Sequence, residues 1–539
     1  MKHFIKGLAV LTVSLSALSA SSSAQTVAFQ GIGSSAIFLE LGLAASTSTG
    51  ASPAGLGATC LWTTKTSGVV VATDGSTNGG GKTDTGNAFV AWTPVGGSCS
   101  TVNSSTVIYS YLQTDSVVGD RCLFNGCTIA NNGSGANSAN LILSSGEVPL
   151  TSAIAAALNA HTTVTAAGTD IRPEDAEFAI TRALTPCGTA VAPGSQYLGL
   201  GYNNGDLIQS RFGGSFNVIN FSLPAAYSVS AIGATPVVVV VNGDGSTNGF
   251  GDPGLNNLQT GTLASFLDGT FATTQAALTV APTGNTASTL VFIREPLSGT
   301  YNTMEYNVAN TQSQKTSQDV GLNQLAAQAN CTGTAVKSNP LAINSGAGSR
   351  QRAIGTGQEL TEVLSHTNSL GYAFWSVGNF KGFTAAAAPN AKYLTVDGVD
   401  PLQNTYTGGT VPTTPAQIAN VTLAGVANGA YPIWSDLRLV NLGSSPSTVV
   451  TNLANAAQNF APASTRPDFI PFSALTVVRS HFIPPAGVGQ PTTASNGSNR
   501  ACSPTEVGGD VGGVPLTKVG DYNYCFNFSL TTGETGRRR

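Results

Sequence analysis

The chain has 539 residues, a formal net charge of −4 and only 9% charged residues, far below the roughly one quarter that is usual for globular proteins. Nucleic-acid binding needs clustered Lys and Arg side chains, and the only basic run in the sequence is the terminal Arg537–Arg539, which reads as a frayed tail. We therefore expect no nucleic-acid partner, and the length allows two or more domains with cores of their own.

Residues 1–24 have the pattern of a secretory signal peptide. Lys2 and Lys6 form a basic start, an apolar run extends from Leu8 to Leu18, and Ala24 completes a small-residue cleavage site. The run is too short to span a bilayer, and no later stretch of the sequence is long and apolar enough to do so. We expect an exported protein, periplasmic or extracellular, without a transmembrane segment.

The first predicted elements of the mature chain are a strand, a glycine-rich turn and a helix. Thr26–Gln30 reads as the strand, Gly31–Ser35 as the turn, and Ala36–Ala45 as the helix. Residues 50–105 carry little helix signal and are rich in Gly, Thr and Ser, so they read as an insertion. Further insertions are expected near 242–257 and 384–430.

A hexapeptide occurs twice, at Asp74–Gly79 and at Asp244–Gly249. Its Asp-x-Ser-x-Asn-Gly order resembles the start of a calcium loop, but neither copy has a glutamate at the twelfth position. A plain turn-forming loop is the favoured interpretation, with calcium as the alternative.

Strands and helices alternate through the rest of the chain. The predicted strands are Val107–Leu112, Val237–Val241, Gly371–Trp375 and Tyr431–Val440. The stretch Val164–Ile171 leads into Arg172–Ala176, where Pro173 can start a helix. The predicted helices are Val148–Ala160, Leu263–Phe271 and Gln358–His366, and Asp115–Gly119 reads as a turn. Such alternation predicts an α/β protein with mainly parallel strands, whose ligands bind at the carboxyl ends of the strands.

The most informative stretch is Val291–Asn310. Its first three residues are apolar and read as the end of a buried strand, and Tyr301, Met304 and Val308 follow at helical spacing. The loop Arg294–Thr300 would join this strand to the start of the helix, where free backbone N–H groups favour an anion. The plainer alternative is a turn, a capped helix and a surface arginine.

Eight cysteines in an exported chain indicate disulfides. Sequence does not fix their connectivity, and the pairs expected from proximity are Cys60 with Cys99, Cys122 with Cys127, Cys502 with Cys525, and Cys187 with Cys331. The histidines His161, His366 and His481 are scattered and no two cysteines have C-x-x-C spacing, so we expect neither a metal site nor a cofactor.

The order of these pieces resembles the PstS-like phosphate-binding proteins of ABC transporters. The matching segments are Gly31–Ala36, Tyr111–Ser116, Asp170–Ala176, Pro236–Asn242, Leu263–Gly269, Arg294–Thr300 and Ser369–Tyr372. The resemblance implies a two-lobed fold like that of periplasmic binding proteins, each lobe a mainly parallel sheet flanked by helices, joined by crossover strands. Lobe 1 would hold residues 25–235 and 435–539, and lobe 2 residues 236–434.

The resemblance also implies roles for single residues. The phosphate-binding residues would be Ser35, the Ala36 backbone, Ser116, Asp175, Arg294, Ser298, the Gly299 N–H and Thr300. Asp175 would accept a hydrogen bond from a protonated phosphate oxygen, which sulfate does not offer at neutral pH. The implied protein is a monomer without enzymatic activity, and an ABC transporter permease is its implied partner.

Three departures bear on the anion. Ala36 stands where the family has Phe, Val117-Val118 where it has Ser-Gly, and Arg172 where it has Gly. Arg172 could accommodate another oxyanion, or lie outside the pocket as a solvated charge paired with Glu174 or Glu177; the second is favoured.

Two other functions compete with anion binding. The Gly, Ser, Thr and Asn richness and the low charge also suit an extracellular structural or adhesive protein. A secreted hydrolase is the third hypothesis, but the sequence has no G-x-S-x-G elbow, and the neighbouring carboxyls Glu174 and Asp175 would rarely face the same way on a helix.

Overall fold

A computed structural model describes the following parts of the chain: residues 25–73, 84–131, 133, 135–136, 140–143, 146–161, 163–173, 176, 223–245, 249–268, 289–294, 297–304, 307–308, 341–342, 348–353, 355–384, 386–404, 408–478 and 514–515. Outside these ranges lie the signal-like segment, the first copy of the hexapeptide and residues 246–248 of the second copy. Four of the eight cysteines also lie outside them: Cys187, Cys331, Cys502 and Cys525.

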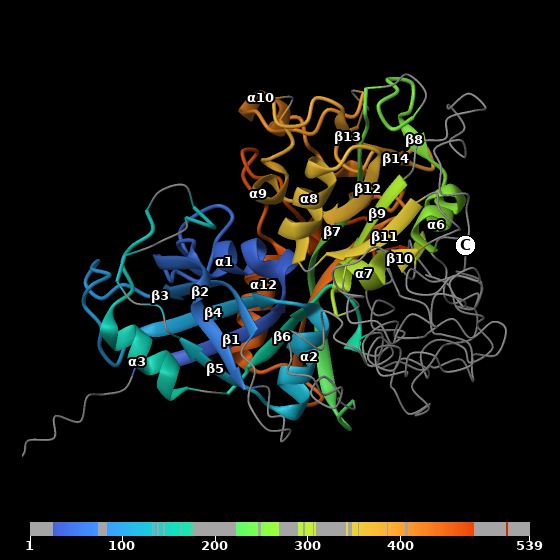
Figure 1. The fold of residues 1–539 in the computed structure, drawn as a ribbon. Coiled ribbons are helices and arrows are strands. Elements are labelled where there is room, and N and C mark those ends of the chain that lie inside the picture. The colour runs from blue at the N-terminus through green and yellow to red at the C-terminus, as the bar shows by residue number, and fades with distance from the viewer. Residues whose placement is uncertain are drawn as a thin grey trace, which may run out of the picture.

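The strands belong to one large sheet and two small ones (Figure 1). They are β1 Thr26–Ser34, β2 Cys60–Thr73, β3 Asp84–Trp92, β4 Val107–Thr114, β5 Thr128–Asn131, β6 Ala166–Thr169, β7 Tyr227–Asn242, β8 Asn257–Leu258, β9 Thr289–Arg294, β10 Leu341–Ala342, β11 Gly348–Ala353, β12 Ser369–Phe374, β13 Ala391–Tyr393, β14 Thr395–Val396, β15 Trp434–Leu442, β16 Ile470–Pro471, β17 Val477–Val478 and β18 Val514–Pro515.

The helices lie against both faces of the large sheet. They are η1 Ser35–Ile37, α1 Phe38–Ser46, α2 Ser116–Asn125, α3 Ser152–Ala160, α6 Thr260–Asp268, α7 Gly299–Met304, α8 Gly355–Ser365, α9 Val377–Phe380, α10 Pro415–Ile418, α11 Ala424–Ala427, α12 Thr448–Gln458 and η8 Phe472–Ala474. Within the described residues, none of these helices is long and apolar enough to cross a membrane.

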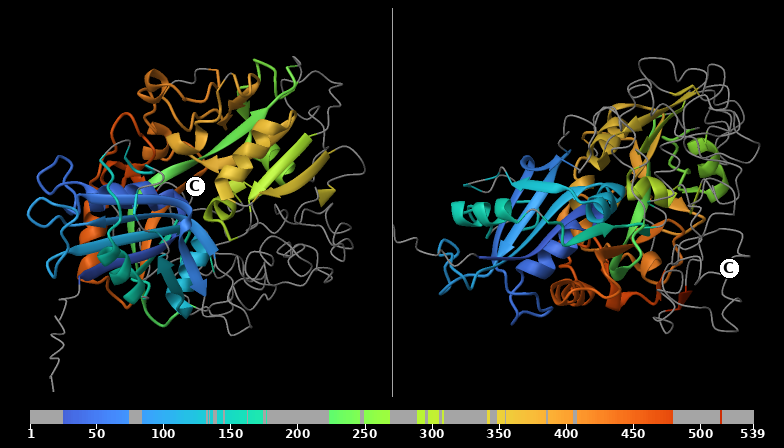
Figure 2. Two further views of the ribbon diagram at one scale, coloured as in Figure 1. Left: turned by 60° about the vertical axis from the view of Figure 1, so that its left-hand side comes forward. Right: turned by 90° about the horizontal axis from the view of Figure 1, so that it is seen from below.

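The large sheet has two halves, which we call lobe 1 and lobe 2. The strand order is β10-β11-β9-β12-β7-β15-β6-β1-β4-β3-β2-β5. Strands β4, β1 and β6 are parallel in lobe 1, and β11, β9 and β12 are parallel in lobe 2. Antiparallel strands flank each parallel set, and Figure 2 shows the two lobes from other sides. The predicted α/β, two-lobed architecture is confirmed. The expectation of mainly parallel strands is wrong, because antiparallel pairings outnumber parallel ones among the described strands.

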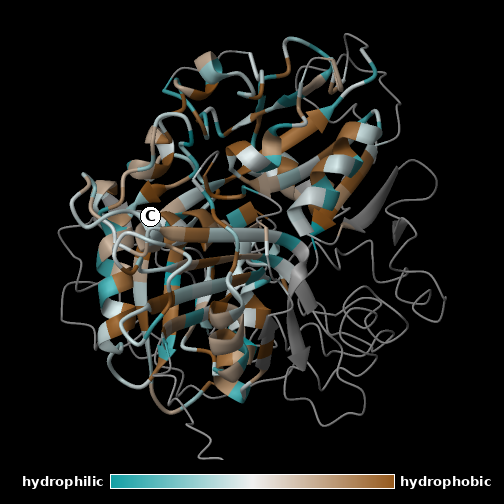
Figure 3. Cartoon of the chain, turned by 90° about the vertical axis from the view of Figure 1, so that its left-hand side faces the viewer, coloured by the Kyte–Doolittle hydropathy of each residue, from teal (hydrophilic) through white to brown (hydrophobic). Residues whose placement is uncertain are grey.

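Strand β7 belongs to both lobes. Its first part pairs with β15, up to Pro236 opposite Trp434, and from Val237 onward it pairs with β12. Val237–Val241 is entirely buried, as expected for a run of β-branched residues covered on both faces. In Figure 3 hydrophobic residues follow the strands, and hydrophilic residues gather mainly in loops and on outer helix faces.

Lobe 1 has a separate core on each face of its sheet. Successive residues of β3 alternate between them, with Val90 in the core beneath α2 and α3, and Phe89 in the core beneath α1 and α12. This alternation is the period of a strand covered on both faces. The core of lobe 2 is formed around Val237–Val241, β9 and β12, with helices α6 and α8 over it.

Several boundaries differ from those predicted. Gly31–Gly33 continues strand β1 instead of forming a turn, and Ser116–Gly119 begins helix α2 instead of a turn. Residues 60–73 and 84–92, expected within an insertion, form β2 and β3 and extend the sheet of lobe 1. The disulfides Cys60–Cys99 and Cys122–Cys127 are both present, as predicted. The predicted lobe boundaries at 235/236 and 434/435 stay predictions.

Candidate functional site

The carboxyl ends of the parallel strands of the two lobes face each other. In lobe 1, β1, β4 and β6 run in the same direction, so the residues after them lie at one edge of the sheet. In lobe 2, β9 ends at Arg294 and β11 ends at Ala353, just before α7 and α8 begin. These edges are where open α/β sheets place their ligands.

Arg294 is buried between the lobes, with only 2% of the residue exposed. Its Nη1 donates a hydrogen bond to Thr356 Oγ1 at 2.8 Å, and its Nη2 donates to Asp115 Oδ1 at 3.4 Å. Its Nε lies 3.9 Å from Glu359 Oε2. The guanidinium is thus held between a carboxylate of lobe 1 and one of lobe 2, and the surface arginine of the plainer alternative is wrong.

A serine, an aspartate and a glycine meet beside this arginine. The Ser116 hydroxyl donates to Asp170 Oδ1, and both residues are buried. A Cβ added to Gly299 would lie 1.5 Å from Asp170 Oδ1 and 2.4 Å from Ser116 Oγ, so no larger residue fits without movement. Because Gly299 comes from lobe 2 and the other two from lobe 1, this contact also joins the lobes.

We call Asp115, Ser116, Asp170, Arg294 and Gly299 the sealed cluster. Burial raises the pKa of the Asp170 carboxyl above its usual value, and the Ser116 hydrogen bond and the positive charge of Arg294 oppose this shift. The cluster therefore holds an aspartate whose charged form depends on the neighbouring donors.

The start of α7 completes the lobe 2 side. The Ser298 hydroxyl accepts a hydrogen bond from the Tyr301 N–H at 3.4 Å, and the Ser298 carbonyl accepts from Asn302 Nδ2 at 2.8 Å. Thr300 is buried in the first turn. Leu297, just before the helix, is packed in the core of lobe 1, and its carbonyl accepts the Val117 N–H at 3.2 Å.

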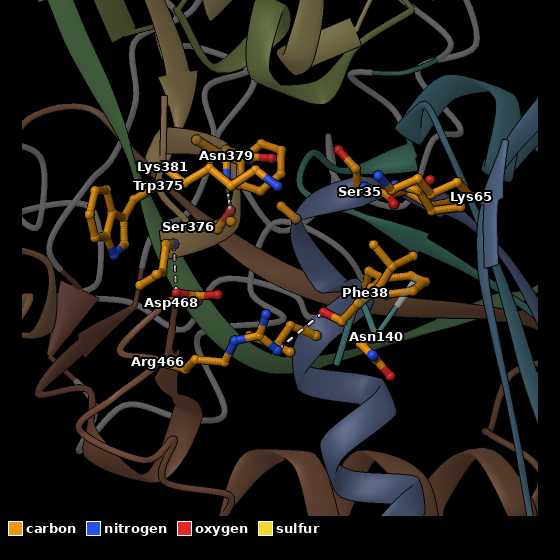
Figure 4. A pocket seen from close by; sticks show the side chains of 18 residues that line it. Ser35, Phe38, Lys65, Asn140, Trp375, Ser376, Asn379, Lys381, Arg466 and Asp468 are labelled. Carbon is orange, nitrogen blue, oxygen red and sulfur yellow. Dashed lines mark hydrogen bonds between the residues drawn. The ribbon is translucent and has the colours of Figure 1, made fainter. Parts of the chain in front are cut away.

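Two of the predicted binding residues lie elsewhere. Ser35 and Ala36 line a separate cavity of about 410 Å³ that opens between the lobes near α1 and α9 (Figure 4). The helix cap is Ser34, not Ser35: Ser34 Oγ accepts the Ala36 N–H at 3.1 Å. The backbone donor expected of Ala36 is therefore already occupied within its own turn.

The fate of the remaining predicted residues differs. Asp175, with its neighbour Glu174 and with Glu177, lies outside the described residues. Arg172 is only 1% exposed, so its expected position as a solvated charge is wrong. Within the described parts, no group of three or more His, Cys, Asp or Glu side chains is placed to hold a metal ion.

Sequence reasoning missed Asp170, Asp115, Thr356 and Glu359. Asp170 was within reach, because it directly follows strand β6 at the same sheet edge as Ser116. Thr356 and Glu359 follow β11, whose sequence GSRQRA has no apolar run to mark it as a strand. Nothing local in the sequence indicates that Asp115 would face an arginine from 179 residues away.

Comparisons with known proteins place this chain near phosphate-binding proteins only at low similarity. The phosphate-binding protein from Stenotrophomonas maltophilia shares 14% identity, with 83% of this chain and 91% of that chain covered and a TM-score of 0.31. A putative phosphate ABC transporter substrate-binding protein from Clostridium perfringens, with bound phosphate, shares 13% identity, with 46% of this chain and 72% of that chain covered and a TM-score of 0.27. An ABC-type phosphate transport receptor from Vibrio cholerae shares 13% identity, with 44% of this chain and 68% of that chain covered and a TM-score of 0.26.

No protein-family model and no curated protein sequence matches the chain. Because the structural scores are also low, the function proposed below is argued from the sealed cluster itself.

Proposed function

We propose that this protein is an exported solute-binding protein that captures a small tetrahedral oxyanion, phosphate in the first place, between its two lobes. The role involves binding and release without a chemical step. The observation that carries the proposal is the burial of Arg294 at the junction of the lobes, beside the Ser116 hydroxyl of lobe 1 and the Gly299 backbone of lobe 2.

A dry anion site needs many donors, because burying a charged ion without them costs several kcal/mol or more. Arg294 offers a planar fork that suits a tetrahedral oxyanion. Ser116 offers a hydroxyl from lobe 1, and Ser298, Gly299 and Thr300 offer hydroxyls and N–H groups from lobe 2. These donors come from strand ends far apart in sequence, which is the arrangement expected of a ligand site.

The lobes in this structure are closed directly on each other. Besides the Arg294–Asp115 contact, the Thr303 and Ser435 hydroxyls lie 2.6 Å apart across the lobes. Access to the sealed cluster requires the lobes to separate, which is the reverse of the hinge closure by which two-lobed binding proteins enclose their ligands. An oxyanion would then exchange places with the carboxylates as partner of Arg294.

Selection of phosphate would depend on an aspartate. A carboxylate accepts a hydrogen bond from a protonated phosphate oxygen. Fully ionised sulfate offers no proton, so the carboxylate and the sulfate oxygen that faces it would both be left without a hydrogen bond. The family resemblance implies this role for Asp175. We propose Asp170 in its place, because Asp170 contacts both Ser116 and Gly299.

The location and partner follow from the same role. Residues 1–24 would direct the chain to the periplasm or the outside, and an ABC transporter permease would be the partner if the bound anion is imported. We propose that the protein acts as a monomer.

Calorimetry of the mature protein with phosphate, arsenate and sulfate tests the proposal. The wild-type protein should bind phosphate and arsenate in a one-to-one ratio, and Arg294→Ala should weaken binding by about 100-fold, as for loss of a buried charged donor. Arg294→Lys keeps the charge but loses the fork and should give an intermediate loss. Lys381→Ala, at an exposed lysine outside the sealed cluster, is the matched control and should bind normally.

Circular dichroism and thermal unfolding should show that the variants are folded. Wild-type affinity in the folded Arg294→Ala protein would remove Arg294 from the site. Ordered assembly of the wild-type protein without any anion binding would instead favour the structural or adhesive role.

A further inference from the structure

The cavity of about 410 Å³ lined by Ser35 and Ala36 contains none of the five residues of the sealed cluster. We call it the open pocket. One wall belongs to lobe 1 and is formed by the start of α1 and by single residues of β2, β3 and β4. The other wall runs from the end of β12 through α9, and Arg466 and Asp468 close it below (Figure 4). The volume lies in the range of pockets for small organic ligands, of roughly 300 to 1,000 Å³.

The pocket has an excess of positive charge. Lys65 reaches it from lobe 1, Lys381 from lobe 2, and Arg466 from the segment after α12, against the single carboxyl of Asp468. Within the described part of the chain, neither lysine ammonium group has an ion pair or hydrogen bond, and both residues are exposed. Arg466 donates to the backbone carbonyls of Leu141 and Ile142, so its charge is not neutralised by those contacts.

The one opposing charge, that of Asp468, is buried. Burial raises the pKa of the Asp468 carboxyl to about 6, although the Val377 N–H and the charge of Arg466 act in the other direction. Asp468 Oδ1 is also committed to the Val377 N–H at 2.8 Å. Three cations therefore line the pocket against one acid, and one oxygen of that acid is held by the protein backbone.

The neutral lining is rich in amides and hydroxyls. Asn87, Gln113 and Asn140 lie along the lobe 1 wall, and Ser376 and Asn379 along the other. The Asn379 amide nitrogen is buried and has no hydrogen-bond partner among the described residues. Phe38 adds an apolar ring beside Ser35 (Figure 4). Phe374 and Trp375 also line the cavity. Amides and hydroxyls together with aromatic rings suit a ligand with several hydroxyl groups and some C–H surface.

We propose that the open pocket binds a sugar-sized, polyhydroxylated organic anion, with a carboxylate or a phosphate as its charged group. The cations would hold the charged group, and the amides and hydroxyls would hold the hydroxyl groups. An inorganic oxyanion alone is much smaller than the cavity and would leave most of this lining without a partner. This site is separate from the sealed cluster and does not depend on the function proposed for it.

The test is calorimetry of the full mature protein with four probes: glucuronate, glucose 6-phosphate, neutral glucose and inorganic phosphate. At least one of the two anionic sugars should bind one-to-one, and glucose should bind at least about tenfold more weakly. The double variant Lys65→Gln, Lys381→Gln should weaken the anionic sugar by about tenfold and leave inorganic phosphate unchanged. Which anionic sugar binds more tightly identifies the charged group.

The Arg294→Lys variant separates the two sites. It should retain wild-type affinity for the anionic sugar while losing affinity for phosphate, and excess phosphate should not displace the sugar. The proposal is overturned if neither anionic sugar binds, if glucose binds equally well, if the double lysine variant binds the sugar as the wild type does, or if phosphate displaces the sugar stoichiometrically. Failure of phosphate binding alone would overturn the proposed function and leave this proposal standing.

Discussion

The sealed cluster and the open pocket both lie between the lobes, yet their charged groups are held in opposite ways. In the sealed cluster, Arg294 is 2% exposed and lies between the carboxylates of Asp115 and Glu359. In the open pocket, Lys65 and Lys381 are exposed, and their ammonium groups have no partner among the described residues. The same junction therefore holds one site whose donors are already bound to protein and one whose cations face solvent.

The difference has an energetic consequence. Buried charges interact strongly but are costly to separate, whereas exposed charges are screened by water and salt. A ligand of the sealed cluster must displace protein partners while the lobes move apart, so shape and donor geometry should control its affinity. A ligand of the open pocket enters without such displacement, so net charge should control its affinity. The following experiments test this contrast.

The largest effect is expected from a methyl group placed in the sealed cluster. In Gly299→Ala, the new Cβ would lie 1.5 Å from Asp170 Oδ1 if nothing moved, so the lobes should fail to close and phosphate affinity should fall by about 100-fold or more. Gly378→Ala is the matched control, because its Cβ would meet nothing within 4 Å and Gly378 lines the open pocket. Calorimetry of both variants measures the effect, and equal affinities in the two would place Gly299 outside the site.

The second effect concerns the buried acid of the open pocket. The pKa of the Asp468 carboxyl in the folded protein is raised to about 6 from 3.8. Between about pH 4 and pH 6 the folded protein therefore keeps the carboxyl proton, whereas the unfolded chain has lost it. The resulting stability is fully present below about pH 4 and is lost as the pH rises through about 6, by at most about 3 kcal/mol.

Asp468→Asn keeps an oxygen acceptor for the Val377 N–H but cannot titrate. Urea unfolding at about pH 4 and about pH 7 should therefore show a smaller loss of unfolding free energy in this variant than in the wild type. The other carboxyls titrate in both proteins and cancel in the difference. Identical pH dependence would mean that Asp468 is not held in a raised-pKa environment.

The third experiment compares two aspartates: Asp175, to which the family resemblance gives the selecting role, and Asp170, for which we propose it. Asp170→Asn removes the charge that should reject sulfate, so the ratio of phosphate to sulfate affinity should fall by about tenfold or more. Asp175→Asn should leave this ratio unchanged. Competition calorimetry gives both ratios, and the reverse result would return the selecting role to Asp175.

The smallest effect is the response to salt. Raising NaCl from about 0.05 M to about 0.5 M should weaken binding of the anionic sugar to the open pocket by about threefold or more, because exposed charges are screened over the Debye length. Phosphate held in the sealed cluster should respond less. Equal salt sensitivity of the two ligands would contradict the contrast between the sites.

The sequence predicted the parts of the fold that depend on local periodicity. The valine run Val237–Val241 marked a buried strand, and Tyr301, Met304 and Val308 marked the helix after Arg294; all are buried as the pattern required. Arg294 itself was identified because the strand before it and the helix after it were both readable.

The errors arose where a glycine serves close packing between elements. A Cβ on Gly33 would lie 2.1 Å from the Gly168 carbonyl oxygen, and one on Gly119 would lie 2.7 Å from the Gly33 Cα. These glycines let β1, β6 and α2 approach closely, but in sequence they read as turn residues. Likewise, the burial of Arg172 follows from tertiary packing, which a rule about loop charges does not contain.

Strand β7 has a further consequence for how the molecule can be divided. This one strand is hydrogen-bonded to β15 in lobe 1 and to β12 in lobe 2, and its pairing changes between Pro236 and Val237. The backbones of these two residues still form hydrogen bonds with neighbouring chain segments. A chain cut at this point would give two fragments, each lacking part of a shared strand and each presenting an unpaired edge that favours aggregation. We therefore expect neither half to be recoverable as a stable fragment, and a limited protease should find the segment around Pro236 resistant as long as the rest of the fold is intact.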